Sequence, residues 1–177
     1  MSEEFTMVID GTMVVGQAGQ TVMQVARDNE IKIPSLCDSP HLAAFGSCRM
    51  CIVEVDGMRG TPSSCTTPAN SGMQVSTTSD RLWELRRGLT ELYVSEHPLD
   101  CLTCTANGDC ELQDVAAEVG LREIRYDNTP SCEGMPIDES NPFFSFDPSK
   151  CIVCSRCIRA CDDIQATHAL SIDGRGF

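Results

Sequence analysis

Four cysteines near the C-terminal end of the chain have the spacing of ligands for an inorganic cluster. They form the run C-x2-C-x2-C-x3-C and comprise Cys151, Cys154, Cys157 and Cys161. In [4Fe-4S] sites of this spacing, three thiolates bind one cluster and the fourth reaches a second cluster. The chemistry that such clusters supply is one-electron transfer. We call these residues the third group, because two further sets of candidate ligands precede them.

The third group does not complete a pair of clusters by itself. Its first three cysteines lack a fourth ligand, and its last cysteine lacks three companions. Asp162 follows the run, where two-cluster sequences usually carry proline. A second four-cysteine run would have to follow Phe177, so we expect an N-terminal fragment of a longer protein. Cys132 is a candidate substitute ligand, but its turn-type neighbourhood also fits an unliganded thiol.

The first group of candidate ligands lies in the N-terminal half of the chain. It comprises Cys37, Cys48, Cys51 and Cys65. A tight C-x2-C pair with one cysteine on either side suits a [2Fe-2S] centre, which takes two thiolates at each iron. The plant-type spacing has four residues between its first two cysteines, whereas ten occur here. A structural zinc site with four cysteines remains the alternative.

The second group combines one histidine with three cysteines. Its members are His97, Cys101, Cys104 and Cys110. The histidine precedes a C-x2-C pair, and the last cysteine lies at the start of a predicted helix, so together they supply four ligands to an iron-sulfur cluster. A neutral imidazole in place of a thiolate removes one negative charge, which raises the reduction potential. A zinc site with the same four ligands is the alternative.

Short-range patterns predict a hairpin and a helix ahead of the first group. Residues 5–15 contain two β-rich runs around Asp10-Gly11, a dipeptide typical of two-residue hairpin turns. Thr21 precedes an apolar run and has Gln24 three positions later, the pattern of a capping box. We therefore expect a short helix that ends near residue 29.

Two further segments have the composition of strands. Residues 51–57 alternate like a strand that enters a turn, and residues 73–77 read as a closing strand. A hairpin, a helix and two returning strands predict an α+β chain that opens with a β-grasp [2Fe-2S] domain. We assign this domain to residues 1–78.

A small helical domain is expected over residues 79–127. Its first helix is predicted to start after Ser79 and to bury a stripe of leucines at helical spacing, namely Leu82, Leu85, Leu89 and Leu92. Pro98 prevents its continuation. A second helix is predicted over residues 111–119 and ends at Gly120, a residue favoured after helix C-termini. This domain carries the second group.

The remaining residues divide into a linker and a partial domain. Residues 128–142 contain three prolines and one glycine, which indicates a linker or wrapping loop. Residues 143–177 carry the third group and predict part of a bacterial-ferredoxin-like [4Fe-4S] domain.

Composition agrees with several small units stabilised by metal. The chain has 177 residues, 12 cysteines and 5% aromatic residues, too few large side chains for one large core. No signal-peptide pattern directs it to an oxidising compartment, so we expect cytoplasmic thiols rather than disulfides. No apolar run is long enough to predict a membrane span. A formal charge of −13 argues against nucleic acid as a partner.

The order and spacing of the three groups resemble one family. It comprises the N-terminal region of the large iron-sulfur subunit of respiratory complex I, the diaphorase small subunit of NAD-reducing hydrogenases, iron-only hydrogenases, and the α subunit of NAD-dependent molybdenum formate dehydrogenases. The motifs are Cys37-x10-Cys48-x2-Cys51-x13-Cys65 and His97-x3-Cys101-x2-Cys104-x5-Cys110. The segments 154–166 and 169–177 look most like the formate dehydrogenase α subunit.

The resemblance implies a function and partners. It implies a module that relays electrons between a molybdenum formate-oxidising centre and an NAD-linked flavin subunit. The flavin (FMN), NAD and molybdopterin would belong to partners or to parts beyond this sequence. No nucleophile, base and orienting group can be recognised, so we expect no catalytic site in this chain.

Two alternatives stay open. The first alternative is the equivalent subunit of an NAD-reducing hydrogenase or of complex I. A hypothesis of another class is a zinc-stapled structural or interaction protein without a redox role, which metal content and the visible spectrum would distinguish.

Overall fold

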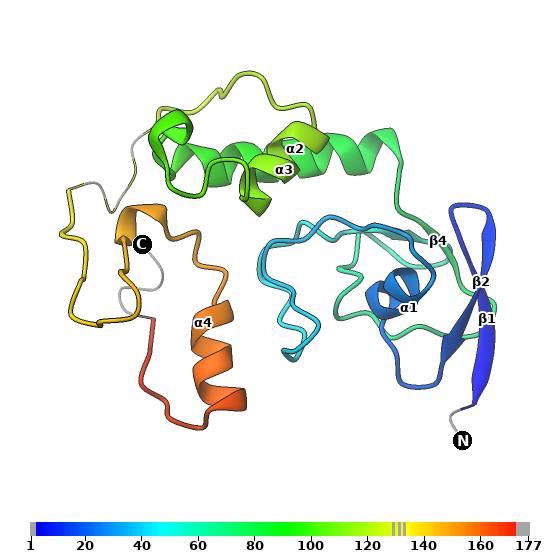
Figure 1. Ribbon diagram of the computed structural model, residues 1–177. Coiled ribbons are helices and arrows are strands. Elements are labelled where there is room, and N and C mark those ends of the chain that lie inside the picture. Colours follow the sequence, from blue (N-terminus) through cyan, green and yellow to red (C-terminus); the bar gives the residue numbers. More distant parts are fainter. Residues whose placement is uncertain (1–2, 129, 131, 133, 173–177) are drawn as a thin grey trace. The chain divides into compact units, whose positions relative to one another are not determined.

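The computed structural model of the protein describes residues 3–128, 130, 132 and 134–172 (Figure 1). The chain divides into two compact units, Met1–Arg86 and Arg87–Phe177, which we call the N-terminal and C-terminal units. The first unit contains the first group of cysteines, and the second unit contains the other two groups. Among the described residues, no helix is long and apolar enough to cross a membrane.

The N-terminal unit opens with the predicted hairpin. Strands β1 (Glu4–Ile9) and β2 (Thr12–Gln17) pair in antiparallel fashion around the turn Asp10-Gly11. Both turn residues have positive φ angles, 49° and 78°. This left-handed geometry is what a type I′ hairpin turn requires, and Asp-Gly adopts it at little cost. The hairpin prediction is confirmed.

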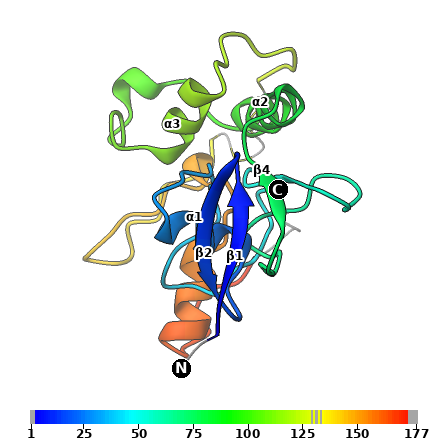
Figure 2. The ribbon, with the colours of Figure 1, turned by 90° about the vertical axis from the view of Figure 1, so that its right-hand side faces the viewer.

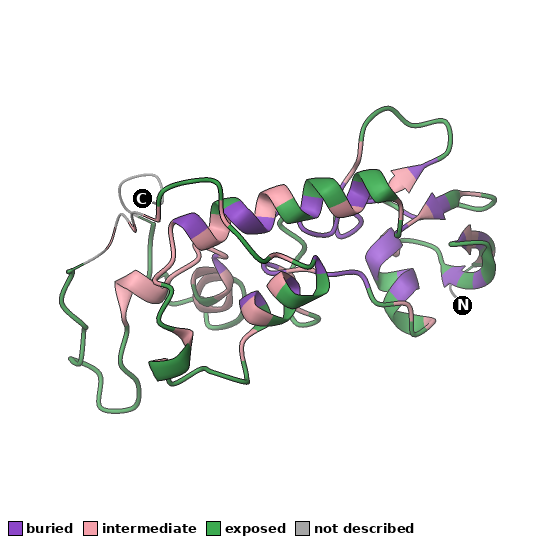
Figure 3. Ribbon diagram, turned by 90° about the horizontal axis from the view of Figure 1, so that it is seen from above, coloured by how far each residue is buried: buried purple, intermediate pink, exposed green. Residues whose placement is uncertain are grey.

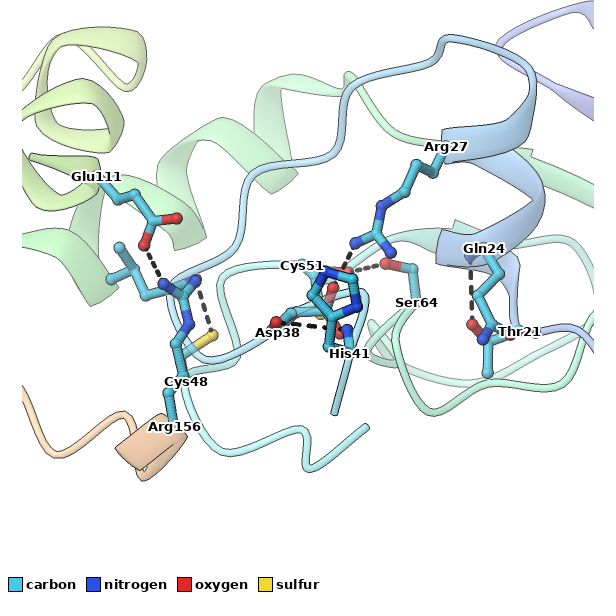
Figure 4. A network of polar contacts seen from close by, with 12 residues as sticks. Thr21, Gln24, Arg27, Asp38, His41, Cys48, Cys51, Ser64, Glu111 and Arg156 are labelled. Carbon is cyan, nitrogen blue, oxygen red and sulfur yellow. Dashed lines mark hydrogen bonds and ion pairs between the residues drawn. The ribbon is translucent and has the colours of Figure 1, made fainter. Parts of the chain in front are cut away.

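Helix α1 (Val22–Asp28) follows, and its N-terminus carries the predicted capping box. The Gln24 backbone N–H donates to Thr21 Oγ1 at 3.3 Å, and the Thr21 N–H donates to Gln24 Oε1 at 2.8 Å (Figure 4). Two backbone donors that the helix leaves unpaired are thereby satisfied. The buried face of α1 is apolar and includes Val22 and Val25.

Two short strands complete a sheet with the order β2-β1-β4-β3. Strand β4 (Gln74–Ser76) runs parallel to β1 (Figure 2). Strand β3 (Glu54–Val55) pairs with β4 in antiparallel fashion. The closing strand is thus where it was predicted. The strand predicted over residues 51–57 is shorter, because the Val53 N–H donates to Pro62 O at 2.9 Å and so bonds outside the sheet.

One hydrophobic core fills the N-terminal unit. It comprises Met7, Ile9, Val14, Val22, Met23, Val25, Ala26, Ile33, Cys51, Val53, Val55, Cys65, Ala69 and Val75. Two predicted ligands, Cys51 and Cys65, therefore belong to the packed core. The fit is tight at Gly16, where an added Cβ would lie 2.8 Å from both the Phe5 ring and Val25 Cγ2. A larger residue there would force the hairpin away from α1.

Helix α2 (Asp80–Ser95) begins after Ser79, whose hydroxyl oxygen accepts from the Leu82 N–H at 3.2 Å. The helix itself is confirmed. The prediction of a buried leucine stripe is wrong, because Leu85 and Leu92 are 39% and 51% exposed. Buried and exposed residues alternate along this long helix (Figure 3). The face that is buried carries polar side chains as well as Leu82. They are Arg86, Thr90, Glu91 and Ser95.

Polar side chains can occupy the buried face of α2 because they have bonding partners on other segments. Arg86 donates to backbone carbonyls of the N-terminal unit. Glu91 accepts from the Arg125 guanidinium at 2.7 Å, which holds the pKa of that carboxyl below its usual value. Paired polar groups can be buried without the penalty that unpaired ones carry.

The C-terminal unit contains little further regular structure near the second group. In this part of the unit lie the 3₁₀ turn η1 (Cys101–Thr103) and helix α3 (Glu111–Glu118). Gly120 follows with φ of 65°, as predicted for a helix end. The Arg87 Nε–H donates to Val119 O at 3.0 Å and ties the end of α3 to α2.

The segment that bears the third group consists of short turns. They are the 3₁₀ turn η2 (Pro148–Lys150), helix α4 (Arg156–Arg159) and the π-helical turn η3 (Ala160–Ile164). Within the predicted linker, residues 128–142, the described residues form one isolated β-bridge, from Asp138 to Phe146 just beyond the linker. Residues 129, 131 and 133 of that linker lie outside the described residues.

Candidate metal centres

All twelve cysteines are free thiols, and the four of the first group are buried. Cys37 and Cys48 form one contact pair. The Cys48 N–H donates to Cys37 Sγ at 3.5 Å, and the Leu36 N–H donates to Cys48 Sγ at 3.5 Å. The hydrogen bond from the Cys48 side chain lowers the pKa of Cys37 to about 5. The same contact, together with burial, raises the pKa of Cys48.

Cys51 and Cys65 form a second pair of the same kind. The hydrogen bond from the Cys65 side chain lowers the pKa of Cys51 to about 7, and that contact together with burial raises the pKa of Cys65. Ser64 donates its hydroxyl to Cys51 O at 2.8 Å and fixes the backbone between them (Figure 4). The first group is therefore brought together as two pairs of sulfurs.

Polar contacts hold the loops that carry these sulfurs. Arg49, between the two cysteines of the C-x2-C pair, has φ of 57°. Its guanidinium donates to Ser63 Oγ at 3.1 Å and to Thr61 O at 3.3 Å, which joins this loop to the one before Cys65. Sequence reasoning did not identify Arg49 as part of the site. An arginine between two cysteines has no signature that distinguishes this role from a solvated side chain.

An ion pair closes the loop after Cys37. Arg27 at the end of α1 donates to Asp38 at 2.5 Å, and the Asp38 side chain is only 9% exposed (Figure 4). Helix α1 is thereby connected directly to the residue after a predicted ligand.

The second group lines one cavity of about 370 Å³ in the C-terminal unit. His97, Cys101, Cys104 and Cys110 all contribute to its wall. His97 Nδ1 lies 2.9 Å from Pro98 O, an acceptor that requires the proton to be on Nδ1. The lone pair of Nε2 is then available to bind a metal, which is the usual arrangement of a ligating histidine and its outer hydrogen bond.

Asn128 fixes the backbone that leads to His97. Its side-chain amide lies 2.9 Å from His97 O, 3.0 Å from Val94 O and 3.2 Å from Ser95 O. These carbonyls lie at the C-terminal end of α2, where helical partners are lacking. Asn128 therefore caps the helix and places the histidine at the same time. The sequence alone did not indicate this residue.

The third group lies closer to solvent than the first. Val153 and Ser155, between its cysteines, have φ angles of 52° and 58°. A positive φ is unusual for a β-branched residue such as Val153. In this conformation the Val153 N–H donates to Cys151 Sγ at 3.4 Å. Arg156 pairs with Glu111 at 2.5 Å and joins α4 to α3 (Figure 4).

Two groups that can donate hydrogen bonds contact the sulfur of Cys161. Its Sγ lies 3.0 Å from Thr167 Oγ1 and accepts from the Ala169 N–H at 3.1 Å. The Thr167 contact lowers the pKa of this thiol and so favours the thiolate, the form in which cysteine binds metals. Cys132, the candidate substitute ligand, is half-buried in a turn-rich loop. Nowhere in the described part of the chain do three or more His, Cys, Asp or Glu side chains converge on a site for one metal ion.

Two protein-family profiles match the chain. Residues 2–80 match the 2Fe-2S iron-sulfur cluster binding domain. Residues 86–125 match the NADH-ubiquinone oxidoreductase-G iron-sulfur binding region. The chain thus contains a [2Fe-2S]-binding domain, in the N-terminal unit, and a region of the [4Fe-4S] type.

Known proteins of several activities are similar to the chain. NADP-reducing hydrogenase subunit HndD of Solidesulfovibrio fructosivorans is 38% identical over 97% of this chain and 30% of its own length. The putative formate dehydrogenase YrhE of Bacillus subtilis is 32% identical over 93% of this chain and 17% of its own length. The chain therefore spans less than a third of these relatives.

A solved structure has the same fold. It is the crystal structure of an NAD+-reducing [NiFe]-hydrogenase in the H2-reduced state, which matches with a TM-score of 0.87 and 36% identity. The match covers 97% of this chain and 71% of that chain. The likeness extends over both units, whereas the two family profiles match residues 2–80 and 86–125.

Proposed function

Because the chain belongs to the family of iron-sulfur proteins that includes the large iron-sulfur subunit of NADH-quinone oxidoreductase, NAD-linked hydrogenase subunits and formate dehydrogenases, we propose that it is an electron-transfer module. Its three groups of ligands bind iron-sulfur clusters, which supply one-electron redox chemistry when bound. The protein's own residues hold the iron, exclude water and set the reduction potential.

The pairing of the first four sulfurs is the observation that carries this proposal. Each iron of a [2Fe-2S] rhomb takes two protein thiolates, so Cys37 and Cys48 would bind one iron, and Cys51 and Cys65 the other. A structural zinc site requires four ligands around one ion, an arrangement that two separate pairs fit less well. A sheet with β1 and β4 parallel at its centre and α1 beside it supports a β-grasp assignment for this unit.

The second and third groups complete the proposed set of ligands. His97 Nε2 and the thiolates of Cys101, Cys104 and Cys110 surround a cavity of about 370 Å³ that suits a [4Fe-4S] cluster. Cys151, Cys154 and Cys157 would bind a further cluster, and Cys161 would serve its neighbour. The corresponding domain boundaries, 1–78, 79–127, 128–142 and 143–177, stay predictions.

For the parent enzyme we propose an NAD-dependent molybdenum formate dehydrogenase of the cytoplasm. The module would carry electrons from a molybdopterin centre to a flavin subunit that reduces NAD. The formate dehydrogenase match supports this assignment. The hydrogenase matches favour a second candidate, the equivalent subunit of an NAD-reducing hydrogenase.

Metal analysis tests the proposed clusters directly. The chain purified under anaerobic conditions should be brown and contain iron with an equal amount of acid-labile sulfide. Dithionite should bleach it and produce EPR signals of [2Fe-2S] and [4Fe-4S] centres. A colourless protein that contains zinc instead of iron would contradict the proposal.

The choice between the two parent enzymes requires the native holoenzyme. Its clusters should be reduced by formate and by NADH but not by H2, as EPR at low temperature can follow. Reduction by H2 and not by formate would favour the hydrogenase alternative.

A further inference from the structure

Arg86 is a fully buried arginine on helix α2, with 0% of its surface exposed. Its guanidinium lies over the ring of Trp83, 5.2 Å from the ring centroid. Arginine is rarely buried completely unless its charge and its donors are compensated. The position of this side chain therefore calls for a reason beyond packing.

The hydrogen bonds of Arg86 lead to the first group of ligands. Its Nε–H donates to Met50 O at 3.2 Å, and its Nη2–H donates to Ile52 O at 2.7 Å. These two residues are the chain neighbours of Cys51 on either side. A third bond runs from Nη1–H to Thr77 O at 2.8 Å, just beyond β4. One planar group thus holds the backbone on both sides of a ligand and ties it to the sheet.

The bonding geometry depends on the shape of guanidinium. Arginine presents five N–H donors in a rigid fork, whereas lysine presents one ammonium group on a flexible stem. Donors on separate edges of the fork can reach carbonyls of different segments at once. The guanidinium is always protonated, so Arg86 brings a positive charge as well as donors to the loop that carries Cys51. Buried charges are screened little by salt.

Resting on the proposed function, we propose that Arg86 is a positioning residue of the [2Fe-2S] centre. It fixes the loop that carries Cys51, and its charge stabilises the reduced, more negative form of the centre. Loss of the charge should lower the reduction potential, and loss of the fork should loosen the ligand loop.

Three variants of the full chain separate charge from shape. Arg86→Gln removes the charge and keeps an amide donor, whereas Arg86→Lys keeps the charge and removes the fork. Arg81→Gln is the matched control, because Arg81 lies on the same helix, is 62% exposed and pairs with Glu54 only at 3.6 Å. Exposed charges of this kind are screened by solvent. Each variant is titrated with dithionite and followed by EPR.

We expect Arg86→Gln to lower the midpoint potential of the [2Fe-2S] signal and to leave the [4Fe-4S] signals unchanged. Arg86→Lys should keep the potential near that of the wild type but lower the amount of [2Fe-2S] signal per protein. Fluorescence of Trp83, the only tryptophan, reports whether the ring contact is lost. An unchanged [2Fe-2S] potential and occupancy in both Arg86 variants, or an equal change in Arg81→Gln, would overturn the proposal.

The variants also separate a failure of the proposed function from a failure of the proposed role of Arg86. If the wild-type chain has no [2Fe-2S] signal, the proposed function fails first. If Arg86→Gln loses only the [2Fe-2S] signal while the [4Fe-4S] signals remain, the positioning role is supported. If Arg86→Gln does not fold at all, Arg86→Lys decides. A [2Fe-2S] signal of wild-type g-values and occupancy in that variant would exclude any need for the fork.

Discussion

His97 supplies a ring nitrogen where the other predicted ligands supply thiolates. We expect His97→Cys to retain a cluster, because the four predicted ligand positions still line the same cavity. The added negative charge should lower the midpoint potential of one [4Fe-4S] signal, since it disfavours the reduced form. A redox titration followed by EPR measures this shift.

His41→Ala is the control for this experiment. His41 is exposed and lies outside the second group, so its replacement should leave every cluster potential unchanged. If His97→Cys also moves no potential, His97 is not a ligand.

At the residue scale, spacing predicted candidate ligands but not the residues that hold them. The C-x2-C pairs are local in sequence, and the chemistry of thiolates restricts what such pairs can do. Arg86 and Asn128 act on backbone carbonyls more than 30 positions away. Any carbonyl can accept such a bond, so the partner leaves no trace in the sequence. These two residues could be recognised only in three dimensions.

The capping box at the start of α1 offers a test at the scale of one element. Thr21→Ala removes the side-chain acceptor of the Gln24 N–H and should destabilise the protein by about 1 kcal/mol. Thermal unfolding under anaerobic conditions measures the loss. Because α1 supplies Arg27 to the loop after Cys37, the [2Fe-2S] absorption should be lost at a lower temperature than in the wild type.

Thr78→Ala is the matched control. Thr78 is exposed and lies between β4 and α2, so it should have a far smaller effect. Equal destabilisation by both substitutions would show that the cap contributes nothing special.

Elements with local signals were predicted well, and those governed by distant partners were not. The Asp-Gly turn, the capping box and Gly120 each encode their geometry within a few residues, and the structure has all three. The buried face of α2 was predicted from its leucines and is wrong. A buried arginine and a buried glutamate define that face instead, because their partners lie on other segments. Helical periodicity contains no information about such partners.

Removal of the clusters should affect the two units unequally. The large hydrophobic core lies wholly in the N-terminal unit. In the described part of the C-terminal unit, the buried apolar side chains are few: Leu112, Val115 and Val119. A unit with so little core depends on bound metal for its folding free energy. After anaerobic chelation of iron, we therefore expect amide hydrogen exchange to rise mainly after residue 95.

The N-terminal unit should retain protection in β1, β2 and α1 under the same conditions. Its predicted ligands Cys51 and Cys65 are part of a core that apolar side chains already fill. Comparable loss of protection in both units, with the same dependence on chelator concentration, would contradict this expectation.

The parallel pairing of β1 with β4 also governs the order of events during synthesis. The sheet cannot close until Gln74–Ser76 have emerged from the ribosome. By that time Cys37, Cys48, Cys51 and Cys65 have all been translated. A cluster delivered to the nascent polypeptide after the sheet has closed therefore meets a complete set of four sulfurs. The topology therefore places all four sulfurs in the translated chain before the sheet closes.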